Sequence, residues 1–490
     1  MVSKTCVIAV IFCLLTNLSG CSGDREEIPL QAETEVLDEA KQVIAPGCTS
    51  CHPFSLDKRH DDLKCISCHE GNDQTADPVT AHLNMVIRPA HPDNMVKSCG
   101  GCHKQTSSAA KSLHFTLNNE VNMIRRHFGA TTDLNTLTEI PRAEPPSSPL
   151  ELADDLLRRR CLRCHIYYEG DEYSGTRRGT GCAACHLEFQ DGRVASHRFM
   201  TKPPDRQCLS CHYGNRVGGD YYGRFDHDFK HEYRTPYQPD SSYPLRPYGV
   251  EQHRLSPDVH QTAGMVCTDC HTKMHGKERM ATTSCRTCHM PQPGLKPAVG
   301  NIVVKENNLI LYSSNGKQLN IPAANDPAHD LYKGKASCAV CHARWSYTDR
   351  NTHLLRIDND DYEEWDDLFI QGSSEIEEFL LNAIYGDGDP DPVMSDKISG
   401  ETLPGIWLMG FKTRRWETPI IAPDQNGKLQ IMRPVLDLNI SWLDAEGETG
   451  FDSLTGRDKG MRPYTPHTIG KAGAFFRQRF PDNQKKTTDK

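Results

Sequence analysis

The sequence has little of the aliphatic and aromatic material that usually fills a protein interior. Hydrophobic residues make up 37% of the 490 residues and aromatic residues only 7%, which is low for a chain long enough to form two or three domains. The sequence also lacks an excess of positive charge. Its formal net charge of −9 argues against nucleic acid as a partner, because phosphate binding requires a basic surface. We therefore expect something other than aliphatic side chains to fill the interior.

Long apolar runs are also missing after the first 20 residues, so no later segment is expected to cross a bilayer. Residues 1–20 carry one charge, Lys4, and then the apolar run 7–15, as in a secretory signal peptide. They end in Leu18-Ser19-Gly20-Cys21, which resembles a bacterial lipobox. The resemblance implies a lipoprotein signal peptide, cleavage before Cys21 and lipidation of its thiol, with a plain secretory signal as the alternative. Because Ser22 follows the cysteine, we expect an exported protein anchored in the outer membrane, at its periplasmic or cell-surface face.

The cysteines are abundant and almost all follow one pattern. Eighteen of the 21 fall into nine copies of Cys-x-x-Cys-His, and the other three are Cys6, Cys13 and Cys21. The nine motifs, numbered in chain order, are Cys48/Cys51/His52, Cys65/Cys68/His69, Cys99/Cys102/His103, Cys161/Cys164/His165, Cys182/Cys185/His186, Cys208/Cys211/His212, Cys267/Cys270/His271, Cys285/Cys288/His289 and Cys338/Cys341/His342.

This spacing fits covalent attachment of haem. Two thiols three residues apart reach the two vinyl groups of one haem, and the adjacent histidine then ligates the iron. Disulfides and zinc ribbons also use paired cysteines, but neither requires a histidine after every second one. Since 23 of 490 residues are histidine, nine such histidines by chance have a probability on the order of 10⁻¹². We predict nine haem c groups, whose porphyrins fill the interior in place of aliphatic side chains.

The remaining 14 histidines are enough to give every haem iron a second histidine ligand. Six of the nine motifs have a free histidine 5–11 residues upstream. Methionine is the alternative axial ligand, but its positions show no pattern. A six-coordinate haem passes electrons, whereas a haem without a distal ligand could bind and reduce a small molecule. The predicted distal ligands are His60, His91, His114, His197, His227, His260, His275, His329 and His467.

The organisation along the chain follows from the motifs and from shifts in composition. We expect a multihaem cytochrome c fold that is loop-rich, with short α-helices wrapped around stacked haems, small β-hairpins and a tryptophan-containing C-terminal α+β region. The expected divisions are a signal peptide at 1–20, an acidic tether at 21–46, a three-haem region at 47–130, a proline-rich linker at 131–150, a five-haem region at 151–295, a β-hairpin insert with the ninth haem at 296–350, and a haem-free C-terminal region at 351–490.

Local patterns predict some of the elements in the later part. Two β-branched and apolar runs within 300–322, together with Asn315-Gly316, indicate a hairpin. Ser374 and Glu377 are spaced as a capping box ahead of apolar residues, which predicts a helix over 375–385. Alternation from Leu436 to Trp442 predicts a half-buried strand.

Several short segments resemble a known group of proteins. They include the stretch from Cys48 to Gly71, Ser112-Leu113-His114, Tyr213-Gly214-Asn215-Arg216, and Pro466-His467-Thr468. The chain resembles the multihaem c-type cytochrome lipoproteins of metal- and selenite/tellurite-respiring bacteria. Such proteins tend to carry further haem sites near two positions where this chain has no cysteine, around His353 and around Phe476. The resemblance therefore implies that two haem sites have been lost.

Together these features predict electron transfer through nine covalently bound haems, in anaerobic or extracellular respiration at the outer membrane. The expected partners are other cytochromes or a porin-type conduit, the membrane through the lipid anchor, and an extracellular electron acceptor. The alternative is a multihaem reductase of a small oxyanion (selenite, nitrite or tetrathionate) at a five-coordinate haem. Such reductases often mark that haem with a deviant motif such as CxxCK, which this sequence lacks. A third class, a filament subunit, also remains open.

Overall fold

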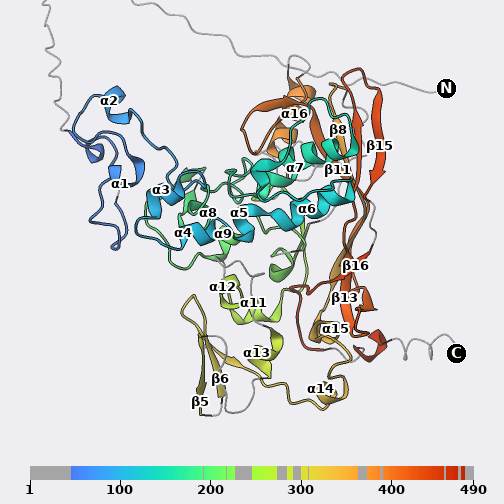
Figure 1. Ribbon diagram of the computed structural model, residues 1–490. Coiled ribbons are helices and arrows are strands. Elements are labelled where there is room, and N and C mark those ends of the chain that lie inside the picture. The colour runs from blue at the N-terminus through green and yellow to red at the C-terminus, as the bar shows by residue number, and fades with distance from the viewer. Residues whose placement is uncertain are drawn as a thin grey trace, which may run out of the picture. The chain divides into compact units, whose positions relative to one another are not determined.

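The computed structural model describes residues 46–53, 55–190, 192–216, 218–226, 246–272, 284–290, 300–306, 308–361, 372–386, 390–456, 460–472 and 476–480. Cys21, nearly all of the predicted tether, His227 and His275 lie outside these residues. Residues 45–490 belong to one compact unit, which mixes short helices with small sheets (Figure 1). Within the described residues, no helix has both the length and the apolar character needed to cross a membrane.

Helices dominate the first half of this unit. They are η1 Cys48–Ser50, α1 Ile66–His69, α2 Pro78–His82, α3 Met95–Cys99, α4 Thr106–Ala109, α5 Leu113–Thr116, α6 Asn118–His127, η2 Leu137–Glu139, α7 Pro149–Arg159, η3 Cys161–Cys164, α8 Ala183–His186 and α9 Asp205–Leu209. The later helices are η4 Asp220–Tyr222, α11 Val259–Ala263, α12 Cys267–Cys270, α13 Cys285–His289, α14 Ala328–Leu331, α15 Cys338–His342, α16 Ser374–Tyr385 and η6 Phe476–Arg479.

The strands form six small sheets within the described residues. Three sheets have two strands each: β1 Phe189–Gln190 with β2 Arg193–Val194, β3 Arg224–Asp226 with β4 Gln252–Arg254, and β9 Val393–Ser395 with β10 Thr402–Pro404. Two sheets have three strands each: β5 Ile302–Lys305, β6 Asn308–Tyr312 and β7 Gln318–Ile321 form one, and β12 Ile421–Pro423, β13 Leu429–Pro434 and β16 Met461–Pro463 form the other. The largest sheet has the order β11-β8-β14-β15, with β8 Ser346–Ile357, β11 Ile406–Glu417, β14 Asn439–Leu443 and β15 Thr449–Thr455.

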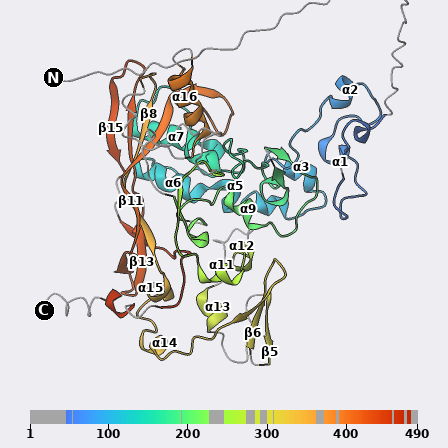
Figure 2. The same cartoon turned by 180° about the vertical axis from the view of Figure 1, so that it is seen from behind.

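The conventional hydrophobic core lies between this largest sheet and α7. Trp407, Ile357 and Ile440 of the sheet are fully buried and pack with Leu152 and Leu156 of α7. The start of α7 is readable from the sequence, because the Ser148 side chain accepts a hydrogen bond from the amide of Glu151 and proline occupies the first turn. Figures 1 and 2, which view the molecule from the front and from behind, both show α6 and α7 next to this sheet. The cysteine-free C-terminal region therefore shares one core with a helix that precedes the fourth motif.

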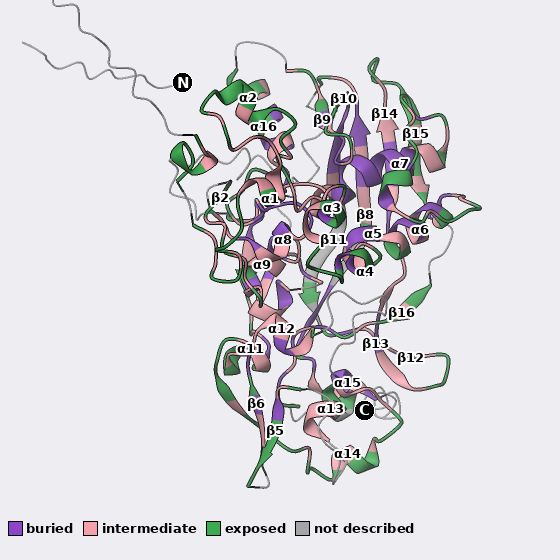
Figure 3. Ribbon diagram, turned by 60° about the vertical axis from the view of Figure 1, so that its left-hand side comes forward, coloured by how far each residue is buried: buried purple, intermediate pink, exposed green. Residues whose placement is uncertain are grey.

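Burial is uneven along the chain. Figure 3 shows buried residues concentrated in β8, β11 and α7, whereas α2 and the outer strand β5 are largely exposed. The proline-rich segment 131–150 packs against the helices, because Leu137 and Ile140 are buried in a cluster with Leu157. Around the motifs themselves, most residues are only half-buried.

The structure contains the three elements that local patterns predicted in the later part of the chain, but it differs from each prediction in detail. The predicted hairpin is a three-stranded sheet, because β7 follows the Asn315-Gly316 turn and pairs with β6. The predicted helix runs over Ser374–Tyr385, but the capping box is wrong: Ser373 is the N-cap residue, and no side chain caps the helix. Glu377 instead forms an ion pair with Arg246 at 2.9 Å. The predicted strand begins only at Asn439, as β14.

Candidate functional site

The CxxCH motifs lie on single helical turns. In such a turn, residues three apart lie on the same face, so both thiols point the same way. The amide of the histidine donates a hydrogen bond to the carbonyl of the first cysteine, as from His69 to Cys65 and from His212 to Cys208, both at 2.9 Å. The fourth motif differs: its turn is the 3-10 helix η3, and the amide of His165 donates to the carbonyl of Leu162 at 2.8 Å.

Seven of the nine CxxCH histidines lie close to a second histidine from elsewhere in the chain, among the described residues. The pairs, with the distances between ring centroids, are His52–His82 at 6.0 Å, His103–His60 at 6.1 Å, His69–His197 at 6.3 Å, His212–His114 at 6.3 Å, His289–His260 at 5.9 Å, His271–His467 at 6.2 Å and His342–His329 at 6.1 Å.

This separation fits a metal ion between the two rings of each pair. A metal bound about 2 Å from one nitrogen of each imidazole places the ring centres roughly 6 Å apart. The separations differ by little, from 5.9 to 6.3 Å, while the angle between ring planes ranges from 6° to 83°. Two imidazoles bound to one metal would show a constant separation and a variable angle. The two metal–nitrogen bonds fix the distance between the rings, whereas each ring can rotate about its own bond. The residues present therefore fit bis-histidine ligation.

The other nitrogen of many of these rings is held by an acceptor. An Nδ1–H that donates to a fixed oxygen sets the tautomer and leaves the lone pair of Nε2 for a metal. The CxxCH histidines held in this way donate to backbone carbonyls: His69 to Val86 at 2.9 Å, His186 to Met200 at 2.7 Å, His289 to Pro322 at 2.8 Å and His342 to Gly470 at 2.9 Å. Among their partners, His60 donates to Asp57 and His260 to Asp258, both at 2.8 Å.

The pairing does not follow proximity in the sequence. His60 lies just before the second motif but pairs with the third, and His197 lies just before the sixth but pairs with the second. His82 was expected to be a spare histidine, yet it faces His52. No spacing rule marks His82, because it follows the second motif and pairs with the first.

The other predicted distal ligands have different surroundings. The ring of His91 meets the edge of Tyr167 at 5.3 Å and is not paired with a CxxCH histidine among the described residues. His227 and His275 lie outside those residues. His353, near one of the positions where the resemblance implied a lost haem, has its Nε2 hydrogen-bonded to the hydroxyl of Ser441 at 2.8 Å.

None of the eighteen motif cysteines forms a disulfide. Burial raises the pKa of Cys161 to about 11 and that of Cys185 to about 12. Cys161 is nevertheless exposed to solvent, so its thiol is open to the attachment of a group.

The thiols also show which motifs are neighbours in space. Cys48 lies close enough to Cys65 to raise the pKa of its thiol, as Cys208 does for Cys267 and Cys338 for Cys285. Other pairs are close enough for the charge of one thiolate to raise the pKa of the other thiol, namely Cys68 with Cys102, Cys182 with Cys99, Cys185 with Cys208, Cys270 with Cys288, and Cys211 with Cys164. The motifs therefore follow one another as 1-2-3-5-6-7-8-9, and the fourth lies beside the sixth as a branch.

Charged groups surround the seventh motif. Burial alone would lower the pKa of His467, but the carboxylate of Asp220, 3.6 Å from Nδ1, outweighs burial and raises it. Asp220 also accepts a hydrogen bond from the amide of His467 at 2.9 Å. This carboxylate therefore orients the ring that faces His271.

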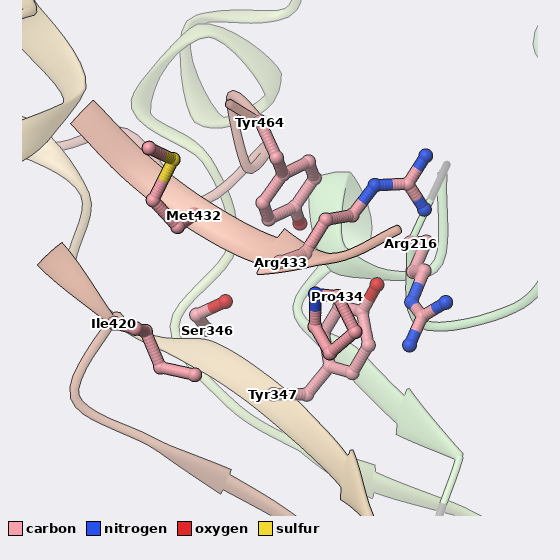
Figure 4. A pocket seen from close by; sticks show the side chains of 8 residues that line it. All are labelled: Arg216, Ser346, Tyr347, Ile420, Met432, Arg433, Pro434 and Tyr464. Carbon is pink, nitrogen blue, oxygen red and sulfur yellow. The ribbon is translucent and has the colours of Figure 1, made fainter. Parts of the chain in front are cut away.

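A small pocket is lined in part by Tyr464 (Figure 4), whose hydroxyl donates a hydrogen bond to the Asp220 carboxylate at 3.5 Å. Two of its arginines lie over tyrosine rings: Arg216 is 5.2 Å from the centre of the Tyr347 ring, and Arg433 is 5.8 Å from that of Tyr464. Burial, with repulsion from neighbouring arginines, lowers the pKa of Arg433. The lining can donate hydrogen bonds to a carboxylate or another anion. The lining residues are Arg216, Ser346, Tyr347, Ile420, Met432, Arg433, Pro434 and Tyr464.

Comparison of the chain with protein-family models, with curated proteins and with solved structures gave no match. In the described part of the chain, histidine, cysteine, aspartate and glutamate do not gather in groups of three or more that could hold a metal ion. The repeated arrangement is a pair of histidines beside a pair of thiols.

Proposed function

We propose that this protein is a nine-haem c-type cytochrome whose function is electron transfer. The observation that carries the proposal is the set of seven histidine pairs, each built on a CxxCH histidine and each with ring centroids 5.9–6.3 Å apart. Each haem iron, when bound, supplies a one-electron redox couple. The paired thiols would hold the porphyrin, the CxxCH histidine would ligate one side of the iron and the second histidine the other.

The histidine pairs favour transfer over catalysis at most of these sites. If both histidines of a pair ligate the haem iron, they would leave it no position for a substrate. The Nδ1 hydrogen bonds keep the rings from turning away, as where His69 donates to Val86 and His60 to Asp57. Seven sites built in this way are suited to passing electrons and unsuited to binding small molecules.

The order of the motifs supports a continuous path. Thiols of successive motifs interact from the first motif to the ninth, with the fourth as a side branch from the sixth. Covalent attachment would place each haem next to its own thiols, so neighbouring motifs imply neighbouring haems. A path of this kind has two ends, at the first motif and at the ninth.

The environment of the first motif suits exchange with a partner. Cys51 and His52 are exposed, and large apolar side chains nearby are also exposed, among them Val79 at 79% and Leu83 at 63%. Exposed apolar surface of this kind marks interaction sites. We propose that another cytochrome or a porin-type conduit receives electrons there. In this proposal the protein is exported and lipid-anchored through Cys21 at the outer membrane, and serves respiration with an extracellular acceptor.

The test is the intact mass and visible spectrum of the purified, matured protein. The mass should equal the processed and lipidated chain plus nine haems, and the reduced spectrum should show the bands of haem c. The double substitution C48A/C51A should remove the mass of one haem, whereas Ser50→Ala, within the same motif, should remove none. A mass equal to that of the bare chain, or a spectrum without a Soret band, would overturn the proposal.

A further inference from the structure

Several buried carboxylates gather around the seventh motif. Two of them contact it directly: Asp269 lies within the motif, and Asp205 accepts a hydrogen bond from the amide of Cys267 at 2.8 Å. A third, Asp220, accepts from the amide of His467 at 2.9 Å and lies 3.6 Å from the Nδ1 of that ring. We use the name seventh-site carboxylates for four aspartates that are each at most 9% exposed, namely Asp205, Asp220, Asp258 and Asp269.

Asp258 joins the seventh site to the eighth. One of its oxygens accepts a hydrogen bond from the Nδ1 of His260, which is paired with His289 of the eighth motif, at 2.8 Å. The other oxygen accepts from the amide of Ile469 at 2.8 Å, two residues after His467. The same carboxylate therefore holds the second histidine of one pair and the backbone beside the second histidine of the other.

The donors to the seventh-site carboxylates are backbone amides, hydroxyls and a histidine ring. Asp269 accepts from the amides of Val266 at 2.9 Å and Ser314 at 2.6 Å. Asp220 accepts from the amide of Gly218 at 2.9 Å as well as from that of His467. An ionised carboxylate is an acceptor only, with room for several donors. These contacts suit aspartates that carry a full negative charge.

Buried carboxylates in other parts of the fold are treated differently. Five of them form an ion pair with an arginine, which compensates their charge. Within the described residues, no lysine or arginine forms an ion pair with a seventh-site carboxylate, and their ion pairs are with His260 and His467. The five arginine pairs are Asp154–Arg125, Asp155–Arg159, Asp171–Arg163, Glu377–Arg246 and Asp396–Arg158.

We infer that the seventh-site carboxylates give the haem of the seventh motif the lowest midpoint potential of the nine. The inference rests on the proposed function, because it requires haem at this motif. Ferric iron carries one positive charge more than ferrous iron, so negative charge nearby favours the ferric state, and burial strengthens that effect. The four aspartates are positioning residues, because they act on the iron through its ligands and its surroundings.

A low potential at this place divides the path of electrons. Cys267 lies close to Cys208 of the sixth motif, and Cys270 lies close to Cys288 of the eighth. An electron received from the sixth motif is passed on to the eighth, so the seventh centre gains none in the exchange and no bond forms or breaks. Because this centre is the last to be reduced, it controls transfer between motifs 1–6 and motifs 8–9.

The test is a spectroelectrochemical titration of the matured protein, with its haem content measured by intact mass. Asp220→Asn and Asp205→Asn each remove one negative charge, so each should raise the lowest of the nine midpoint potentials. At a fixed applied potential, the ratio of reduced to oxidised haem at that centre should rise about tenfold, which corresponds to about 59 mV for one electron. Asp220→Glu keeps the charge and should shift this potential less than Asp220→Asn.

Asp93→Asn is the matched control. Asp93 also lies near a histidine, 3.4 Å from the Nδ1 of His91, but its side chain is 73% exposed. Solvent screens an exposed charge, so this variant should leave the lowest potential unchanged.

The outcomes separate this inference from the proposed function. Nine haems whose lowest potential is the same in Asp220→Asn and Asp205→Asn would overturn the inference and leave the nine-haem proposal intact, as would an equal shift in Asp93→Asn. If a variant loses the haem of the seventh motif, the lowest potential should disappear from the titration, and its persistence would also overturn the inference. An unsubstituted protein without haem would contradict the proposed function itself.

Discussion

The imidazole rings of His271 and His467 lie 6.2 Å apart, although the first belongs to the seventh motif and the second follows the last strand. Asp220, from a third part of the chain, holds the amide of His467. Three distant segments therefore build one pair. The other pairs also join histidines that are not adjacent in the chain, and each can be tested by removing one ring.

Replacement of His467 by alanine should open one axial position. If the pair holds an iron, His467→Ala should convert one low-spin haem to high-spin and add one carbon monoxide per reduced molecule. His353→Ala is the matched control, because this histidine contacts Ser441 and is not paired with a CxxCH histidine among the described residues. Electron paramagnetic resonance and carbon monoxide titration measure both effects. Equal spectra for the two variants would contradict the assignment of His467.

Replacement of His82 tests a residue that the sequence pattern did not select. His82 faces His52, whereas His91, which the pattern did select, faces Tyr167. His82→Ala should therefore produce one additional high-spin haem and His91→Ala none. The same two spectroscopic measurements apply. The reverse result would favour the sequence pattern over the observed pairing.

Replacement of Asp57 tests the tuning of one redox centre. The carboxylate accepts the Nδ1 hydrogen bond of His60 at 2.8 Å, and such a bond makes the imidazole more basic. A more basic ligand stabilises ferric over ferrous iron, so Asp57→Asn should raise one of the nine midpoint potentials by about 30–60 mV.

Spectroelectrochemical titration measures this shift. Asp77→Asn is the control, since Asp77 accepts from Thr80 at the start of α2, and asparagine caps helices equally well. An unchanged set of potentials in Asp57→Asn, or an equal shift in the control, would show that the carboxylate does not tune the ligand.

Replacement of Arg356 tests the stability of the C-terminal core. This side chain is fully buried and pairs with Asp358 at 2.7 Å and with Asp155 at 3.3 Å. Arg356→Met would leave buried carboxylates without their cation, so the free energy of unfolding should fall by about 3–5 kcal/mol.

Urea denaturation followed by far-ultraviolet circular dichroism measures this loss. Arg142→Met removes a partner of an exposed ion pair with Glu401 and should cost at most about 1 kcal/mol. Similar midpoints for the two variants would show that burial of Arg356 does not have the expected consequence.

The sequence by itself identified the nine units of two thiols and a histidine, because their spacing is local. Two thiols three residues apart with a histidine next to the second form a unit on one helical turn, as in α13 and α15. Periodicity and turn signals also predicted the helix α16 and a hairpin in the region of β6, where the structure has a three-stranded sheet. The boundaries were less predictable: the acid expected to cap α16, Glu377, is instead held by Arg246, which is distant in the chain.

Only the tertiary structure decided which histidines meet. A histidine near a motif in the sequence can turn towards any motif that packs beside it, so spacing selected His60 but not its partner His103, and it passed over His82. The order of the motifs likewise depends on long-range packing. Local sequence fixes the residues that can bind a group, and the fold fixes the distances between them.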